Sequence, residues 1–169
     1  MKLWGAFVCI LFLACPCVPR APAASTESSG SLRFFVQDFY NWYVPKFWKS
    51  SPKPAVRIAL RRRALFSAEL TAALGDHLRR LGKHRRASAA YLYDPILNAG
   101  DACERYRVGA ISSEGEYYAV DIYAVCFGNM RPTLALTAEL KRDGDRWVFV
   151  NFRYPHEKDF RAQVRTSGE

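Results

Sequence analysis

The sequence predicts an α+β domain in which N-terminal helices pack on a four-stranded antiparallel sheet. Before residue 90, apolar side chains recur at three- and four-residue steps, which is the period of an amphipathic helix. After residue 104 they alternate with polar side chains, as in strands with one buried face. Short turn sequences separate these strands, so helices come first and an antiparallel sheet follows. A chain of 169 residues suits one such domain.

Residues 1–23 have the form of a signal peptide. The apolar run from Leu3 to Ala14 is too short for a membrane span of about 20 residues. The small-x-small pattern of Ala21-Pro22-Ala23 predicts cleavage and export to the periplasm or cell envelope. An alternative is a lipid anchor, because Phe12-Leu13-Ala14-Cys15 resembles a lipobox in which Cys15 is lipidated. Only in that case is the membrane an expected partner.

The cysteine count favours one disulfide in the exported domain. Cys9, Cys15 and Cys17 belong to the leader, which leaves Cys103 and Cys126. An even pair in an oxidising compartment predicts a bond between them. Two buried free thiols are the alternative.

The first helix is expected after a flexible linker at residues 24–31, which are rich in Ser, Thr and Gly. Ser31 is positioned to cap it, and Pro45 weakens its last turn. Its buried stripe comprises Leu32, Phe35, Phe39, Trp42 and Tyr43. Such a stripe is usually core, with Tyr40 or Tyr43 as the phenol that would point into a pocket.

A second helical region follows. Val56 to Leu60 predicts a short helix, and Ser67 is expected to cap a longer one. One face of the longer helix carries Leu70, Leu74, Leu78 and Leu81. The region 57–86 is strongly basic and predicts a surface for anionic partners, although a solvated face explains it equally. No nucleic acid is expected, because export separates the protein from it and no aromatic residue lies between Ser67 and Ala90 to stack on bases.

The stretch from Tyr91 to Asp101 joins the helices to the strands. Pro95 disfavours helical geometry at Asp94, and the residues from Asn98 have loop chemistry. We interpret the stretch as a structural corner that also forms a pocket rim. The candidate rim residues are Tyr40, Tyr43, Tyr93, Asp94, Asp101 and Tyr123.

Four strands are expected beyond this corner. The first contains Tyr106, Val108 and Ala110. The second has Tyr118, Val120, Ile122, Ala124 and Cys126 on one face and Tyr117, Ala119, Asp121, Tyr123 and Val125 on the other. Turns or loops are expected at 113–115, 128–132 and 143–145, with Leu134 to Leu140 between the last two. The last strand, 147–153, buries either Val148, Val150 and Phe152 or Trp147, Phe149 and Asn151. Residues 155–169 form a polar tail, so the domain spans 32–154.

Four short motifs resemble, in order, those of the bacterial envelope proteins grouped as domain-of-unknown-function family 3828. They are Phe39 to Tyr43, Leu65 to Leu70, Asp94 to Asp101 and Asp145 to Tyr154. The resemblance implies a fold like that of nuclear transport factor 2, in which a curved sheet wraps helices into a cone with a pocket. It implies no reaction.

Composition and motifs favour a non-catalytic envelope domain that binds a small apolar or amphipathic ligand, or a protein, in the cone and its rim. Nucleophile elbows, phosphate loops and dinucleotide fingerprints are missing from the sequence. The three histidines lack metal-ligand spacing, so neither a metal nor a cofactor is expected. One alternative is an isomerase or hydrolase with a pocket base among Asp94, Asp101 and Asp121. Another is an inhibitor of a cell-wall enzyme, with the basic region meeting an acidic cleft.

Overall fold

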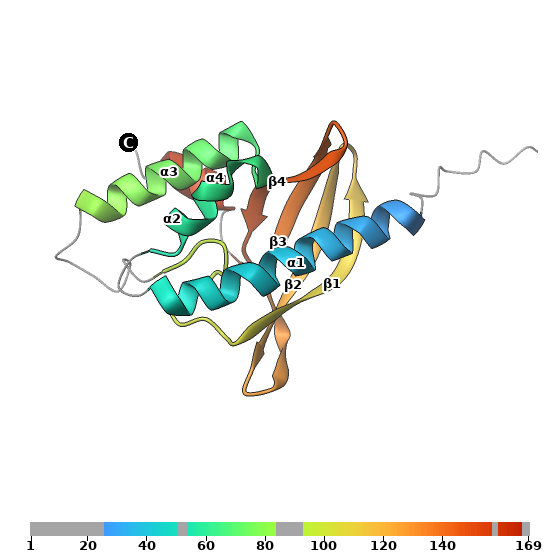
Figure 1. Cartoon of the computed structure of the whole chain (residues 1–169), viewed down its shortest axis with the longest axis horizontal. Coiled ribbons are helices and arrows are strands. Elements are labelled where there is room, and N and C mark those ends of the chain that lie inside the picture. The colour runs from blue at the N-terminus through green and yellow to red at the C-terminus, as the bar shows by residue number, and fades with distance from the viewer. Residues whose placement is uncertain (1–25, 51–53, 84–92, 157–158, 167–169) are drawn as a thin grey trace, which may run out of the picture.

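The chain forms one antiparallel sheet with helices packed on it, in a computed structural model that describes residues 26–50, 54–83, 93–156 and 159–166. The strands lie across the sheet in chain order (Figure 1). The elements are α1 (Thr26–Ser50), α2 (Val56–Ala59), the 3-10 helix η1 (Leu60–Leu65), α3 (Ala68–Lys83), β1 (Arg105–Glu114), β2 (Tyr117–Cys126), β3 (Asn129–Asp143), β4 (Arg146–Arg153) and α4 (Phe160–Thr166). The predicted α+β class, with N-terminal helices on a four-stranded antiparallel sheet, is confirmed.

Helix α1 is longer than its apolar stripe. It begins at Thr26 and continues through Pro45 to Ser50, so the linker predicted at 24–31 is wrong from Thr26 onward. Once the stripe docks, each further helical residue adds one hydrogen bond at little cost, and weak helix formers are carried along. Ser31 lies inside α1 rather than at its start, and its hydroxyl accepts the indole N–H of Trp147 at 3.3 Å.

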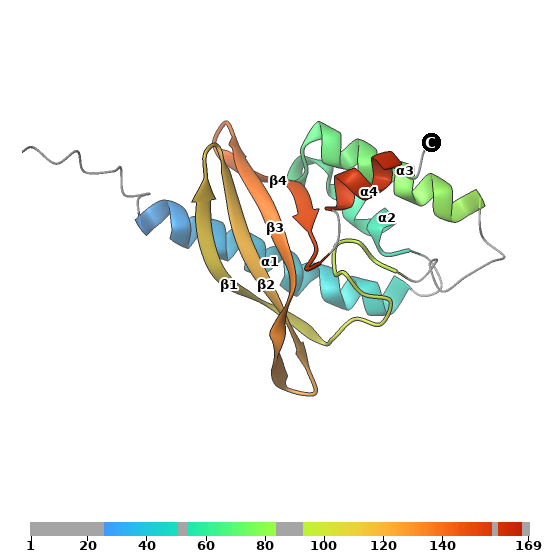
Figure 2. The ribbon, with the colours of Figure 1, turned by 180° about the vertical axis from the view of Figure 1, so that it is seen from behind.

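The core lies between α1 and the sheet, with α2, α3 and α4 gathered beside β4 (Figures 1 and 2). Phe39 of α1 is the hub of an aromatic cluster. Its ring centroid lies 4.7 Å from that of Phe149, 5.5 Å from Tyr43 and 5.9 Å from Phe66. Aromatic pairs at these separations add to the gain from burying their area. The aromatic stripe of α1 is therefore used mainly for packing.

Bulges change which residues face the core. Register shifts occur in all three strand pairs, and each extra residue reverses the inward and outward alternation. In β4 the shift lies opposite Leu140, between Phe149 and Asn151. Trp147 and Phe149 face the core before it, and Phe152 faces the core after it. The sequence predicted that β4 buries either one set of alternate residues or the other. The bulge lets it bury residues from both sets.

Helix α1 also closes one edge of the sheet. The Gln37 side chain donates to the Tyr106 carbonyl at 2.9 Å and accepts the Val108 N–H at 3.1 Å. The Arg33 guanidinium donates to the carbonyls of Val108 at 3.0 Å and Gly109 at 2.8 Å. An outer strand otherwise presents unpaired backbone groups that can recruit other chains. These two side chains satisfy part of the free edge of β1.

The loop predicted at 128–132 is wrong. A two-residue turn at Phe127 and Gly128 joins β2 to β3, and β3 starts at Asn129. Pro132 lies between Met130 and Leu134, where the register with β2 shifts, and β4 pairs with β3 only from Thr137 onward. A proline is tolerated at such an irregular position because its missing N–H is not needed for the ladder. The turn predicted at 113–115 is also displaced, since β1 continues to Glu114.

Helix α3 starts as predicted. The Ser67 hydroxyl accepts the N–H of Leu70 at 3.2 Å, which caps the helix. The Ser67 N–H donates to the Phe149 carbonyl at 2.8 Å and ties this start to β4.

The polar tail predicted at 155–169 is wrong for its central part. Residues Phe160–Thr166 form α4, with Phe160 and Val164 buried. Asp159 caps the helix by accepting the Ala162 N–H at 2.9 Å. Two apolar residues four positions apart suffice for one buried helical face, so the domain extends at least to Thr166.

Candidate functional site

The corner between helices and sheet is held by four tyrosine hydroxyls. Tyr154, Tyr40 and Tyr106 donate to the successive carbonyls of residues 95, 96 and 97, at 2.8, 3.2 and 3.3 Å. The Tyr43 hydroxyl donates to Oδ2 of Asp94 at 2.6 Å. Because buried polar groups need partners, these phenols allow an irregular loop to be buried. Tyr40 and Tyr43 therefore contact the corner from inside the core.

Asp94 organises the same loop. Its Oδ1 accepts the N–H groups of Ile96 at 2.9 Å and Leu97 at 3.2 Å, in the manner of an Asx turn. The carboxyl is buried, and burial raises its pKa from 3.8 to about 6 despite the lowering effect of its hydrogen bonds. Both oxygens are occupied by the protein itself. These contacts favour a structural role over that of a base meeting a substrate.

The other candidate rim residues are dispersed. Tyr93 is half-buried, and its hydroxyl contacts Oδ1 of Asn98. Tyr123 lies over Gly109, where an added Cβ would come within 2.5 Å of the Tyr123 ring. Asp121, on the same strand, accepts the Thr137 hydroxyl at 3.2 Å. Of the six residues predicted for the rim, Asp101 is the one that lines the larger described cavity.

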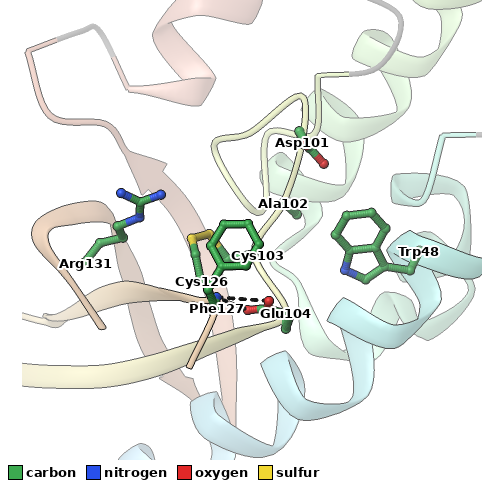
Figure 3. Close-up of a pocket in the computed structure, with 8 residues that line it drawn as sticks. All are labelled: Trp48, Asp101, Ala102, Cys103, Glu104, Cys126, Phe127 and Arg131. Atoms are coloured by element: carbon green, nitrogen blue, oxygen red, sulfur yellow. Dashed lines mark hydrogen bonds between the residues drawn. A yellow bond between two sulfur atoms is a disulfide. The ribbon is translucent and has the colours of Figure 1, made fainter. Parts of the chain in front are cut away.

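That cavity, of about 310 Å³, is a groove beside the disulfide (Figure 3). We call it the corner groove, and its lining residues are Trp48, Asp101, Ala102, Cys103, Glu104, Cys126, Phe127 and Arg131. They come from the end of α1, the loop before β1, and the β2–β3 hairpin. Trp48 lies on one side of Phe127 and Arg131 on the other (Figure 3). The groove thus combines two aromatic side chains with charges of both signs.

The disulfide predicted between Cys103 and Cys126 is present. The Cα atoms are 4.8 Å apart and 23 residues apart in sequence. The bond fastens the loop before β1 to the end of β2, so it joins two of the three segments that line the corner groove. The number of cysteines outside the leader is enough to predict this pair.

Phe127 has an unusual backbone conformation. It is 86% exposed, and its φ is 52°, followed by 77° at Gly128. A two-residue turn with both φ values positive favours Asn-Gly or Gly-Gly, and an aromatic residue at the first position is strained. The carboxylate of Glu104 helps to hold the turn by accepting the Phe127 N–H at 2.9 Å. The structure therefore maintains an exposed aromatic side chain where local preference opposes it.

Charge in the corner groove is divided between its two ends. Asp101 lies toward Trp48, and the Arg131 guanidinium lies at the far end (Figure 3). Glu104 is committed to the Phe127 N–H. Arg131 is thus the cation of the groove that a bound anionic group would meet.

The basic region 57–86 is described only as far as Lys83. Within that part, Arg62 stacks at 4.0 Å over Trp42, and Arg80 donates to the Val164 carbonyl at 2.8 Å. Arg79 pairs with Asp76. Several of these cations therefore have structural contacts, while Arg57, Arg61 and Arg63 are exposed.

A second, smaller cavity of about 120 Å³ lies between α3 and α4, with His77 in its lining. His77 Nε2 is buried without a hydrogen-bond partner among the described residues. Burial, with the nearby charge of Arg80, lowers the pKa of this imidazole. Its ring packs edge-on against Phe160, with 5.7 Å between the ring centroids. His77 therefore helps to pack α4 against α3.

Sequence reasoning missed Trp48, Phe127 and Arg131. The pair Phe127-Gly128 is a signal in the sequence, because a bulky aromatic residue directly before a turn glycine is not expected to pack in the core. Trp48 lies at the end of a helix whose other aromatic residues, apart from Phe34, are buried or half-buried, so the helical pattern does not single it out.

The described residues contain no cluster of three or more His, Cys, Asp or Glu side chains suited to a metal ion. Every helix in the described ranges is too short or too polar to cross a bilayer.

Fold and groove together define a small α+β domain with an aromatic groove at a disulfide-fastened corner. The chain matches no family model, no curated protein and no solved structure. The resemblance to family 3828 thus stays a prediction.

Proposed function

We propose that this protein is an exported, non-catalytic binding domain whose corner groove takes a small apolar ligand that carries an anionic group. The observation that carries the proposal is the pair of exposed aromatic residues, Trp48 and Phe127, beside Arg131 in one cavity. Ligand sites combine apolar walls with a few polar groups that fix orientation. The disulfide agrees with an oxidising compartment.

The hydrogen bonds of Asp94 weigh against a catalytic role for this residue. Its two oxygens accept hydrogen bonds from Tyr43, Ile96 and Leu97, and its carboxyl lies outside the corner groove. A general base must reach the proton that it removes. Binding therefore fits the geometry better than a reaction in which Asp94 is the base.

We also propose that the fold is a variant of the cone implied by family 3828. Support comes from the bulges in all three strand pairs, which bend a sheet, and from α1 lying on one face. In this form of the cone, aromatic side chains fill the interior, and the binding site lies at the corner instead. An experimental structure of a family member would test the comparison.

The test of binding uses two fluorescent probes of similar shape, the anionic anilinonaphthalene sulfonate and the neutral phenylnaphthylamine. Trp48→Ala should lower the affinity for both probes by about tenfold, the order expected for losing one aromatic wall. Arg131→Gln should lower the affinity for the anionic probe only. Phe34→Ala is the matched control, because Phe34 is 74% exposed on α1 outside the groove. Equal loss in Phe34→Ala and Trp48→Ala would contradict the proposal.

A further inference from the structure

The β2–β3 hairpin extends beyond the rest of the sheet. All residues from Phe127 to Thr133 are exposed, because β4 pairs with β3 only from Thr137 onward. Figures 1 and 2 show this hairpin projecting past the helices and the other strands. We call residues 127–131 the hairpin tip. The tip therefore offers side chains to a surface beyond the body of the protein, and two of them, Phe127 and Arg131, also line the corner groove.

The hairpin tip is apolar at its end. Phe127 and Met130 are 86% and 59% exposed, and neither belongs to the core cluster or its packed margin. The positive φ of Phe127 makes an aromatic side chain unfavourable at this turn. Strain of this kind, held by the surrounding structure, points to a function for the residue.

Exposed cations lie beside this apolar end. Arg131 belongs to the tip itself, and Arg105 is the cross-strand neighbour of Val125, which pairs on its other side with Met130. Arg107, opposite Tyr123, is also exposed. The whole chain has a formal charge of +9. An apolar end with these cations beside it is complementary to the interface of an anionic bilayer, where apolar groups enter and cations meet phosphates. The Glu104 carboxylate also lies beside the tip and accepts the Phe127 N–H.

We propose that the hairpin tip docks this protein on an anionic phospholipid surface. Two exposed apolar side chains provide far less area than the roughly 800 Å² per partner of a specific protein interface. Peripheral attachment to a bilayer needs only a shallow apolar insertion and nearby basic residues. The inference goes beyond ligand binding. It shares Phe127 and Arg131 with the corner groove, whereas Met130 and Arg105 lie outside that groove.

The key variant is Phe127→Asn. Asn followed by Gly is the pair that this turn favours, so the variant keeps the hairpin while removing the aromatic side chain. Met130→Thr likewise suits a strand. The matched control is Phe34→Gln, which removes an aromatic that is 74% exposed elsewhere. All variants keep the same N-terminus, so any contribution from that end is equal among them.

The measurement is co-flotation of the full chain with phosphatidylglycerol–phosphatidylcholine vesicles and with pure phosphatidylcholine vesicles. We expect binding to the anionic vesicles only, a loss of about tenfold or more in Phe127→Asn with Met130→Thr, and no loss in Phe34→Gln. Arg105→Gln should lower the affinity by about fivefold, with a weaker dependence on salt.

Equal binding to neutral and anionic vesicles would overturn the proposal, as would undiminished binding by the double variant. Capture of an envelope protein that the double variant loses, without vesicle binding, would assign the tip to a protein partner instead. The fluorescent probes keep the two proposals separate. Met130→Thr alone should weaken vesicle binding and leave probe binding unchanged, whereas Trp48→Ala should weaken probe binding and leave vesicle binding unchanged.

Discussion

At the scale of single residues, Asp94 shows how one carboxylate can dominate a corner without being an active site. It accepts two backbone N–H groups and the Tyr43 hydroxyl inside the core. The surrounding carbonyls are met by three other phenols. The concentration of polar residues that suggested a pocket rim therefore has a structural explanation.

Asp94 also makes the stability of the fold depend on pH. Its folded-state pKa of about 6 lies above the ordinary value of 3.8. Folding thus favours the protonated form, and this contribution is complete below about pH 4 and is lost as the pH rises through 6. Asp94→Asn should remove the effect. The stability of wild type relative to Asp94→Asn should fall by about 2 to 3 kcal/mol between pH 4 and pH 7.

Urea denaturation at the two pH values measures this difference. Asp94→Ala is the companion variant, and it should lose about 2 to 4 kcal/mol at both pH values because the buried Tyr43 hydroxyl and Ile96 N–H lose their acceptor. Parallel pH profiles for wild type and Asp94→Asn would show that the carboxyl does not titrate in this range.

At the scale of elements, the docking of α1 on β1 explains how the outer strand is protected. The side-chain amide of Gln37 makes two hydrogen bonds with β1 of the kind that a neighbouring strand would make. Arg33 continues the same edge toward Gly109. The helix therefore contributes to both the core and the edge of the sheet.

Gln37→Leu should destabilise the domain by about 1 to 2 kcal/mol, because the Val108 N–H and the Tyr106 carbonyl lose their partners. It should also increase self-association through the uncovered edge. Denaturation and size-exclusion chromatography measure the two effects. Asn41→Ala is the matched control, since Asn41 contacts Gln37 on α1 but has no recorded bond to β1. A Gln37→Leu protein as stable and monomeric as the control would contradict this role.

At the scale of the whole molecule, the disulfide couples the sheet to the loop that leaves the buried corner. Cys103 follows that loop, and Cys126 ends β2 directly before the hairpin tip. The bond therefore supports both the corner groove and the base of the projecting hairpin.

Replacing both cysteines with serine should lower the free energy of unfolding by about 3 kcal/mol, the chain-entropy value for closing a loop of this length. Guanidinium denaturation of the variant, compared with wild type with and without reductant, measures the loss. Reduced wild type should match the double variant. If reduction left stability unchanged, the bond would not constrain the unfolded chain.

Local chemistry determined much of this protein from sequence alone. The change of period from helical to alternating identified the class, because burying one face imposes that period on each element. The Ser67 cap and the cysteine pair follow from similarly local rules. The corner around Asp94 was recognisable because Pro, Asn, Asp and Gly have strong backbone preferences.

Only the tertiary structure decided which of these residues lie beside one another. Helix α4 forms because β4 and α3 provide a surface for Phe160 and Val164. The bulges that turn both Phe149 and Phe152 inward depend on neighbouring strands. The corner groove joins residues 48, 101 and 131, which no local pattern connects. Periodicity reports which side of an element is buried, whereas a binding surface depends on which elements end beside one another.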